Sequence, residues 1–288
     1  MTSDLNSTYT VEAKEHPSVQ TNLKTAYVLS IIIAILATVA SAGGLLLDGL
    51  YRDNLFGVAA WKGNDVVTLF VAVPLLIAAL VFSGRGSLRA QLIWMGMLDY
   101  ALYNYAFYLF AAAFNWFFLI YVALFGCSIY ALIFGLTNLD VNRISRQIRE
   151  RTPIKWIAGY MLFVAVGLSL IYFAQSLNFV FTGQLPAIIE KVDHPTNVVF
   201  ALDLTLMVPV LVLGAIWLLK RKPWGYVLAG ISTVKGPVYT LVLTVSGLWI
   251  VNSGAADATG EIFLWPCLTV AGSLAGAFLF GNMIPAKR

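Results

Sequence analysis

Runs of about twenty apolar residues, repeated eight times along the chain, constrain the fold more than any other feature. Each run is long enough to cross the roughly 30 Å hydrocarbon core of a bilayer as an α-helix. Hydrophobic residues make up 60% of the 288 residues and charged residues only 11%, whereas a soluble domain carries roughly 25% charged residues. The pattern therefore predicts an all-α integral membrane protein with eight transmembrane helices in one bundle.

Residues 25–285 hold the predicted spans, and residues 1–24 are polar, mixed in charge and without apolar periodicity. We expect residues 1–24 to form a disordered cytoplasmic tail. A cleaved signal peptide is not indicated, because a long polar segment precedes a full-length apolar run. The spans are expected at about 26–47, 66–82, 92–113, 116–135, 156–174, 198–219, 224–251 and 262–283.

The basic residues predict the orientation of the spans. One side of the predicted bundle carries fourteen lysines and arginines, namely Lys14, Lys24, Arg85, Arg89, Arg143, Arg146, Arg149, Arg151, Lys155, Lys220, Arg221, Lys222, Lys287 and Arg288. The other side carries three: Arg52, Lys62 and Lys191. Because positive loops stay in the cytoplasm, both termini are expected there, in a multi-pass protein of the inner membrane. The net charge of +4 then needs no nucleic-acid partner.

The two halves of the chain have a similar spacing between a proline and a charged residue inside the predicted spans. Pro74 precedes Asp99 by 25 residues, and Pro209 precedes Lys235 by 26. Four spans in each half would make two parallel repeats, related by an axis along the membrane normal. Chance recurrence of proline is the alternative. The halves would be residues 25–137 and 154–285.

Three ionisable residues lie well inside the predicted spans: Asp99, Asp203 and Lys235. A charge at that depth costs at least a few kcal/mol and usually pairs with another. Counted from the basic residues that flank their helices, Asp99 and Lys235 lie at depths that differ by only about 5 Å. Asp203 lies nearer the outer face, as an interfacial carboxylate or an entry residue. We therefore predict that Asp99 pairs with Lys235, with Asp203 as the alternative partner.

The span that carries Asp99 is more polar than packing requires. Asp99 and Tyr103 are four residues apart, as are Tyr100 and Asn104, and Asn104 and Tyr108. This spacing places the side chains above one another on a helix. We expect them to line, with Asp203 and Lys235, a polar pocket or a proton path. The alternative is a structural network that holds the helix register.

No motif identifies a cofactor or a metal. Cys127 and Cys267 lie in apolar runs without metal-ligand spacing, and the two histidines, His16 and His194, are far apart. Phosphate-binding glycine loops, H-E-x-x-H and G-x-S-x-G are absent from the sequence. We expect no metal site.

The lipid bilayer is the expected partner, and the cofactor, the small-molecule or lipid ligand and the oligomeric state stay open. Tyr51 and Trp61, in the first outer loop, are expected as interfacial anchors.

Two blocks, DYALYNYAFYLF at 99–110 and PWGYVLAG at 223–230, resemble a family of bacterial multi-spanning membrane proteins. The resemblance implies most of the eight spans and no activity. A lysine in the seventh span and a cytoplasmic amino terminus are also similar to the heliorhodopsins, in which the lysine binds retinal as a Schiff base beside a carboxylate. The eighth span and Pro237, two residues after Lys235, depart from that family.

Two classes of function fit these features. In the first, the protein binds or transports a small or lipophilic molecule through a polar cavity with the Asp99–Lys235 pair at its centre. In the second, it is an intramembrane enzyme that uses Lys235 or Asp99 for acid–base or covalent chemistry, or a protein with a retinal-type chromophore. The absence of histidine clusters from the sequence disfavours an enzyme of the desaturase type.

Overall fold

The computed structural model describes residues 17–257 and 261–284, and within these ranges it consists of helices without a β-strand. In chain order the elements are α1 (Pro17–Leu46), α2 (Leu55–Val67), η1 (Thr68–Ala72), α3 (Val73–Gly84), α4 (Leu88–Ala111), α5 (Phe118–Thr137), α6 (Val141–Gln147), α7 (Ile154–Thr182), α8 (Ala187–Val192), α9 (Val198–Leu202), η2 (Asp203–Met207), α10 (Val208–Leu219), α11 (Pro223–Asn252) and α12 (Glu261–Gly281), where η marks a short π-helix.

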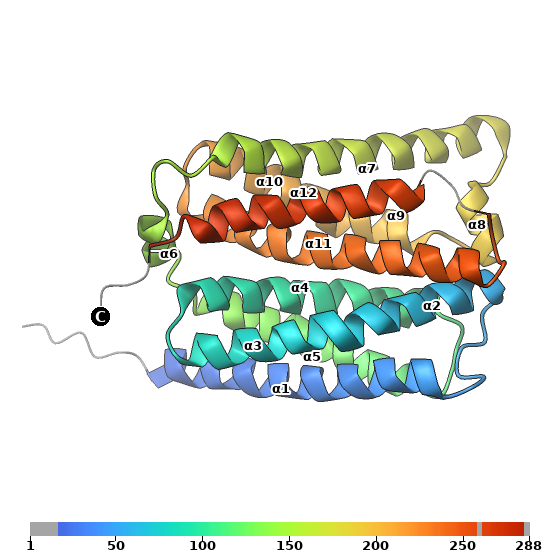
Figure 1. Cartoon of the computed structure of the whole chain (residues 1–288), viewed down its shortest axis with the longest axis horizontal. Helices are drawn as coiled ribbons and strands as arrows, with labels where there is room; N and C mark the ends of the chain where they lie inside the picture. The colour runs from blue at the N-terminus through green and yellow to red at the C-terminus, as the bar shows by residue number, and fades with distance from the viewer. Residues whose placement is uncertain (1–16, 258–260, 285–288) are drawn as a thin grey trace, which may run out of the picture.

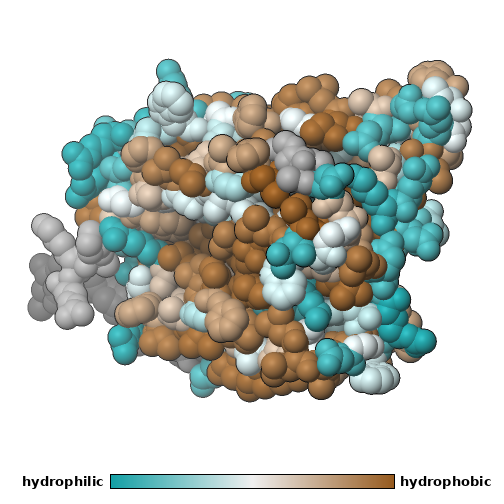
Figure 2. Space-filling model, turned by 45° about the vertical axis from the view of Figure 1, so that its right-hand side comes forward, coloured by the Kyte–Doolittle hydropathy of each residue, from teal (hydrophilic) through white to brown (hydrophobic). Residues whose placement is uncertain are grey.

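Seven helices of the described chain are long and apolar enough to cross a membrane. They are Leu23–Leu46, Leu55–Gly84, Phe118–Thr137, Ile154–Thr182, Val198–Leu219, Pro223–Asn252 and Ile262–Gly281. Large apolar side chains cover their outer faces, and Trp156 and Phe181 are about 80% exposed. Figure 2 shows apolar residues over the middle of the molecule and hydrophilic residues mainly toward its two ends. The protein is therefore a helical membrane protein, as predicted.

Helix α4 is long but differs from these seven in its polarity. It has 24 residues, and most of them are buried, including Tyr100, Tyr103, Asn104 and Tyr108. Its neighbours α3, α5 and α11 pack around it. Because other helices shield α4, its polar side chains can be satisfied inside the protein.

The helices form two layers (Figure 1). One contains α1, α2–α3, α4 and α5, and the other contains α7, α9–α10, α11 and α12. The layers meet where α11 packs against α4 and α2. Two glycines allow this close approach: a Cβ on Gly96 would lie 2.6 Å from Val234 Cβ, and one on Gly63 would overlap the backbone of Ser246.

The helices that carry Pro74 and Pro209 each contain a π-helical turn at the same place. Thr68 begins η1 six residues before Pro74, and Asp203 begins η2 six residues before Pro209. Proline removes one backbone donor and crowds the preceding turn, and a π-turn is a common way to absorb such a distortion.

The beginning of α1 and the end of α12 lie at one end of the bundle, beside α6 (Figure 1); we call it the α6 end. There the backbone between α6 and α7 pairs with the residues after α12. Arg149 N donates to Asn282 O at 3.1 Å, Ile284 N donates to Gln147 O at 2.8 Å, and Ile148 and Met283 form an antiparallel bridge. The Arg89 guanidinium, on α4, also donates to Met283 O. We call these contacts of residues 282–284 with Gln147, Ile148, Arg149 and Arg89 the inner clamp; it joins both layers.

The opposite end carries α8, and we call it the α8 end. The segment before α2 contacts the second layer there: Asn54 Nδ2 donates to Lys191 O at 2.8 Å, and His194 Nε2 lies 3.7 Å from Asp53 Oδ1. The same Asp53 oxygen accepts a hydrogen bond from Ala113 N at 3.1 Å. Short polar contacts therefore tie the layers together at both ends.

Several predicted boundaries differ from the structure. The span expected at 66–82 belongs to a continuous helix from Leu55 to Gly84, which Asn54 caps by accepting a hydrogen bond from Gly57 N. Tyr51 and Trp61, expected as interfacial anchors, are instead 7% and 3% exposed in an aromatic cluster with Tyr108. The tail predicted for residues 1–24 lies largely outside the described residues, and α1 begins within it, at Pro17.

Candidate functional site

Lys235 and Asp99 form an ion pair between the two layers. Lys235 Nζ, from the middle of α11, lies 3.3 Å from Asp99 Oδ2, on α4, and the two side chains are 6% and 22% exposed. Gly96, one turn before Asp99, lets α4 approach α11 closely at Val234. The prediction that Asp99 is the partner of Lys235 is confirmed.

Tyr103 connects this pair to the third intramembrane charge. Lys235 Nζ lies 4.4 Å from the centre of the Tyr103 ring, a cation–π contact. The hydroxyl of Tyr103 donates to Asp203 Oδ1 at 2.7 Å. One aromatic side chain therefore touches the lysine with its face and the second carboxylate with its hydroxyl.

Asp203 is held by two tyrosine hydroxyls. Tyr172, on α7, donates to Asp203 Oδ2 at 2.7 Å, and Tyr103 donates to the other oxygen. The Asp203 residue is 5% exposed, so the expected alternative of an interfacial carboxylate open to water is wrong. Asn197 accepts a hydrogen bond from Phe200 N at 3.1 Å and caps α9.

The other polar residues of α4 face α2 and η1. Asn64 Nδ2 donates to Asn104 Oδ1 at 2.8 Å. Thr68 Oγ1 lies 2.8 Å from Tyr100 Oη and donates to Asn64 Oδ1 at 3.0 Å. Tyr108 donates to Asp65 Oδ1 at 2.9 Å. The polar column of α4 therefore divides: Asp99 and Tyr103 reach the second layer, while Tyr100, Asn104 and Tyr108 stay within the first.

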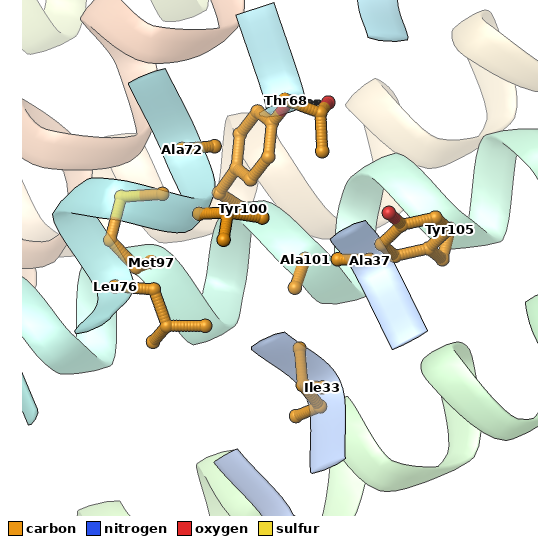
Figure 3. Close-up of a pocket in the computed structure, with 10 residues that line it drawn as sticks. Ile33, Ala37, Thr68, Ala72, Leu76, Met97, Tyr100, Ala101 and Tyr105 are labelled. Carbon is orange, nitrogen blue, oxygen red and sulfur yellow. Dashed lines mark hydrogen bonds between the residues drawn. The ribbon is translucent and has the colours of Figure 1, made fainter. Parts of the chain in front are cut away.

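A small interior cavity lies beside this second group, between α1, η1, α3 and α4. It is lined by Ile33, Ala37, Thr68, Ala72, Val73, Leu76, Met97, Tyr100, Ala101 and Tyr105, with a volume of about 10 Å³, room for about one water molecule. Figure 3 shows the Tyr100 side chain extending to Thr68 beside apolar groups. Tyr103, Asn104, Asp203 and Lys235 are not among its lining residues.

Sequence reasoning missed several members of these networks. The span predicted at 66–82 leaves Asp65 just outside it, although Asp65 is 2% exposed inside α2. Asn64 and Thr68 share its helix face, and Tyr172 supplies the second donor to Asp203. The Asn54 cap was the signal that could have extended the helix far enough to include Asp65. Nothing in the sequence pointed to Tyr172.

Within residues 17–257 and 261–284, no group of three His, Cys, Asp or Glu side chains could hold a metal ion. Cys127 and Cys267 are both free. The site is thus built from one ion pair, tyrosine hydroxyls and buried carboxylates. Such groups can bind a charged ligand, exchange partners and hold protons.

Comparison with protein-family models, with curated proteins and with solved structures finds no match to this chain.

Proposed function

We propose that the protein crosses the bacterial inner membrane eight times, with α4 as the eighth span and the α6 end in the cytoplasm. At 1.5 Å per residue, a helix as long as α4 measures about 36 Å, enough to cross the bilayer core. Its polarity is tolerable because its neighbours, rather than lipid, cover it. The fourteen basic residues predicted to be cytoplasmic favour this orientation.

We also propose that the two layers are parallel repeats. Residue 73, where α3 begins, and residue 208, where α10 begins, are separated by 208 − 73 = 135 positions, and the starts of α4 and α11 by 223 − 88 = 135. The starts of η1 and η2 give the same value, 203 − 68 = 135. The register holds only for these three pairs of starts: those of α2 and α9 are separated by 198 − 55 = 143 positions, and those of α5 and α12 by 261 − 118 = 143. Parallel repeats place their shared site near the membrane midplane.

The function that this geometry supports best is binding or transport of a small or lipophilic molecule at the junction of the repeats. One observation carries the proposal: each repeat supplies one charge of the Asp99–Lys235 pair. A movement of one repeat against the other separates the charges, and a ligand with a carboxylate or an amine can then replace the lost partner. A ligand shifts the two arrangements only if it binds one of them better.

The test is recovery of the ligand with the protein. The wild-type protein is purified with its surrounding lipid, extracted, and compared by mass spectrometry with the double variant Asp99→Leu/Lys235→Met, which keeps the site electrically neutral. We expect a molecule that accompanies the wild type and the surface variant Lys220→Met but not the double variant. Uptake of that molecule into proteoliposomes then separates transport from binding. Identical extracts from all three proteins would contradict the proposal.

A second candidate is a covalent chromophore on Lys235. The carboxylate 3.3 Å from the lysine nitrogen is placed as a counter-ion for a protonated Schiff base, in which the amine condenses with an aldehyde and water leaves. All-trans-retinal added to the purified protein would then produce a visible absorption band, and borohydride would fix the retinal on the peptide that contains Lys235. Failure to label that peptide would leave noncovalent binding as the function.

A further inference from the structure

Asp65 forms a second buried acid–tyrosine site, in the first layer. Tyr51, in the segment before α2, donates to Asp65 Oδ2 at 2.5 Å, and Tyr108 donates to Oδ1 at 2.9 Å. Gly44 of α1 closes the site, since a Cβ there would overlap both Asp65 Oδ2 and Tyr51 Oη. The absence of a side chain at Gly44 therefore lets Asp65 and Tyr51 lie directly against α1.

Among the described residues, no cationic side chain compensates the Asp65 carboxylate. The ion pairs within 4.0 Å are Lys235 with Asp99 and His194 with Asp53. Lys62 lies on the same helix as Asp65 and acts on it only at longer range. An isolated buried carboxylate is costly, and such a group tends to become neutral.

The titratable groups around Asp65 come from several elements. The tyrosines that face it are Tyr51 before α2, Tyr121 on α5, and Tyr100, Tyr105 and Tyr108 on α4. Helix α11 contacts α2 through Ser246, which donates to Ala60 O, and its Lys235 is held by Asp99. Helix α8 brings Glu190 and Lys191 beside Asn54, eleven residues before Asp65. Burial, with the Asp65 carboxylate beside it, raises the pKa of Tyr51 well above its usual range, so this hydroxyl remains a donor.

Both protonation states of Asp65 can be satisfied where it stands. When Asp65 is charged, the hydroxyls of Tyr51 and Tyr108 donate to its two oxygens. When Asp65 takes up a proton on Oδ1, it can donate to Tyr108 Oη. Tyr108 can then turn its own proton to Trp61 O, which lies 3.4 Å away. The exchange moves one proton and one hydroxyl rotor, without displacing a helix.

This site resembles the one around Asp203 in its chemistry, although the position that matches Asp203 in the first layer is Thr68. Both carboxylates lie on the helix that contains the π-turn of their layer, nine residues before Pro74 and six before Pro209. Each accepts hydrogen bonds from two tyrosines, one of them on α4. Between the sites, Asn104 is fully buried, and its Nδ2 has no partner among the described residues, so it is free to bind a water or a passing group.

We propose that Asp65, Tyr51 and Tyr108 form a reversible proton-binding site near the α8 end of the first layer. The proton arrives from the side of the membrane that Tyr51 faces, and neutralises Asp65 while α2 and α11 stay packed. In one respect the inference rests on the proposed function: it makes the proton the coupling ion of transport. Proton binding itself does not depend on any ligand.

Infrared spectroscopy tests the site directly. The full-length protein, with ¹³C in its aspartate carboxyl groups, is placed in lipid nanodiscs and titrated between about pH 4 and pH 10. We expect a protonated-carboxyl band that appears on acidification, persists in Asp203→Asn and is lost in Asp65→Asn. Removing a hydrogen bond to the charged form, in Tyr108→Phe or Tyr51→Phe, should shift the midpoint of this band upward by about one to two pH units.

Each other outcome overturns the proposal. A titrating band that survives in Asp65→Asn belongs to another residue. A carboxyl that keeps one protonation state over the whole range is structural. A band that responds to sodium concentration at constant pH marks a metal-cation site instead. If Asp65→Asn does not fold, Tyr108→Phe and Tyr51→Phe decide the question. A carboxyl-band midpoint in both variants equal to that of the wild type would overturn the proposed proton-binding site. The readout needs no transported molecule, so its failure leaves the proposed function standing.

Discussion

At the scale of single residues, Lys235 and Asp99 depend on one another. The lysine is 5% exposed and sits among the packed residues of α11, where an unpaired ammonium is costly. Asp99 removes most of that cost, and the Tyr103 ring stabilises the ammonium further. Because desolvation offsets the attraction, the pair contributes little net stability, yet losing one partner strands the other.

We therefore expect Lys235→Met and Asp99→Leu each to lower the free energy of unfolding by about 3–5 kcal/mol, and the double variant to recover much of this loss. Unfolding of the purified proteins in mixed micelles measures the effect, with Lys220→Met, at an exposed site, as the control. A double variant whose loss equals the sum of the single losses would show that the two residues do not interact.

Tyr103 has two separable roles. Tyr103→Phe keeps the ring under Lys235 and removes the hydrogen bond to Asp203, so we expect a loss of about 1.5–3 kcal/mol if that carboxyl is charged. Tyr103→Leu removes both contacts and should cost more. The same unfolding measurement ranks the two variants, with Tyr130→Phe, at an exposed tyrosine, as the control. Equal losses in both would mean that the ring contact with Lys235 contributes nothing.

At the scale of the elements, α4 and α11 determine the architecture of the site. Both are largely buried, and glycines at their contacts let charged and aromatic side chains of the two layers meet. In the proline-bearing helices, the π-turns hold Thr68 and Asp203 at matching positions. Since a π-turn rotates the residues before it relative to those after it, it decides which side chains face α4.

Gly96→Ala tests the close approach of α4 to α11. The added Cβ would lie 2.6 Å from Val234 Cβ and 3.1 Å from Ile231 O, so the helices must separate, at about 1–3 kcal/mol of stability. Gly126→Ala is the matched control, because nothing lies within 4 Å of its Cβ position, and it should be neutral or slightly stabilising. Equal effects of the two substitutions on unfolding would contradict the packing.

The inner clamp predicts a local change in hydrogen exchange. Deleting residues 282–288 removes the acceptor of the Arg149 amide and the donor to Gln147 O. We expect the Arg149 amide to exchange faster by at least tenfold, because the deletion removes the carbonyl to which this amide donates its hydrogen bond. The amide of Arg143, which donates to Asp140 Oδ1 at 2.9 Å, should be unaffected. Unchanged protection at Arg149 would show that another group replaces the clamp.

At the scale of the whole molecule, two layers share one polar centre. The beginning of α1 and the end of α12 lie together at the α6 end (Figure 1), as an even number of crossings requires. Contacts at both ends of the bundle hold the layers closed over Asp99 and Lys235. In the proposed transport, movement of one layer against the other would break one set of contacts while keeping the other, as alternating access requires.

Reporter fusions test the orientation and the number of crossings together. Fusions after Lys24, Arg89, Lys155, Lys222 and Arg288 should all be active as cytoplasmic reporters, and a fusion after Arg52 should be active only as an external one. If α4 did not cross, the reporters after Arg89 and Lys155 would lie on opposite sides of the membrane. A single external signal from the first group would refute eight spans with cytoplasmic termini.

The sequence by itself determined the helical membrane class, the approximate spans and the pairing of Asp99 with Lys235. These depend on local properties: the length of apolar runs, and the depth of a charge counted along its own helix. The number of eight membrane spans, the orientation of the protein in the membrane and the role of the site residues stay predictions.

Only the tertiary structure decided which polar groups share a network. Tyr108 and Asp65 are 43 positions apart, and Tyr103 and Asp203 are 100 apart, so their meeting depends on how the helices rotate and cross. The burial of Tyr51, Trp61 and Asp65 likewise follows from α2 starting at Leu55 and packing against α1 and α11, with the Trp61 ring against Tyr108 of α4. The position of a residue within an apolar run places it along the membrane normal, but the direction in which its side chain points is set by the helices packed around it.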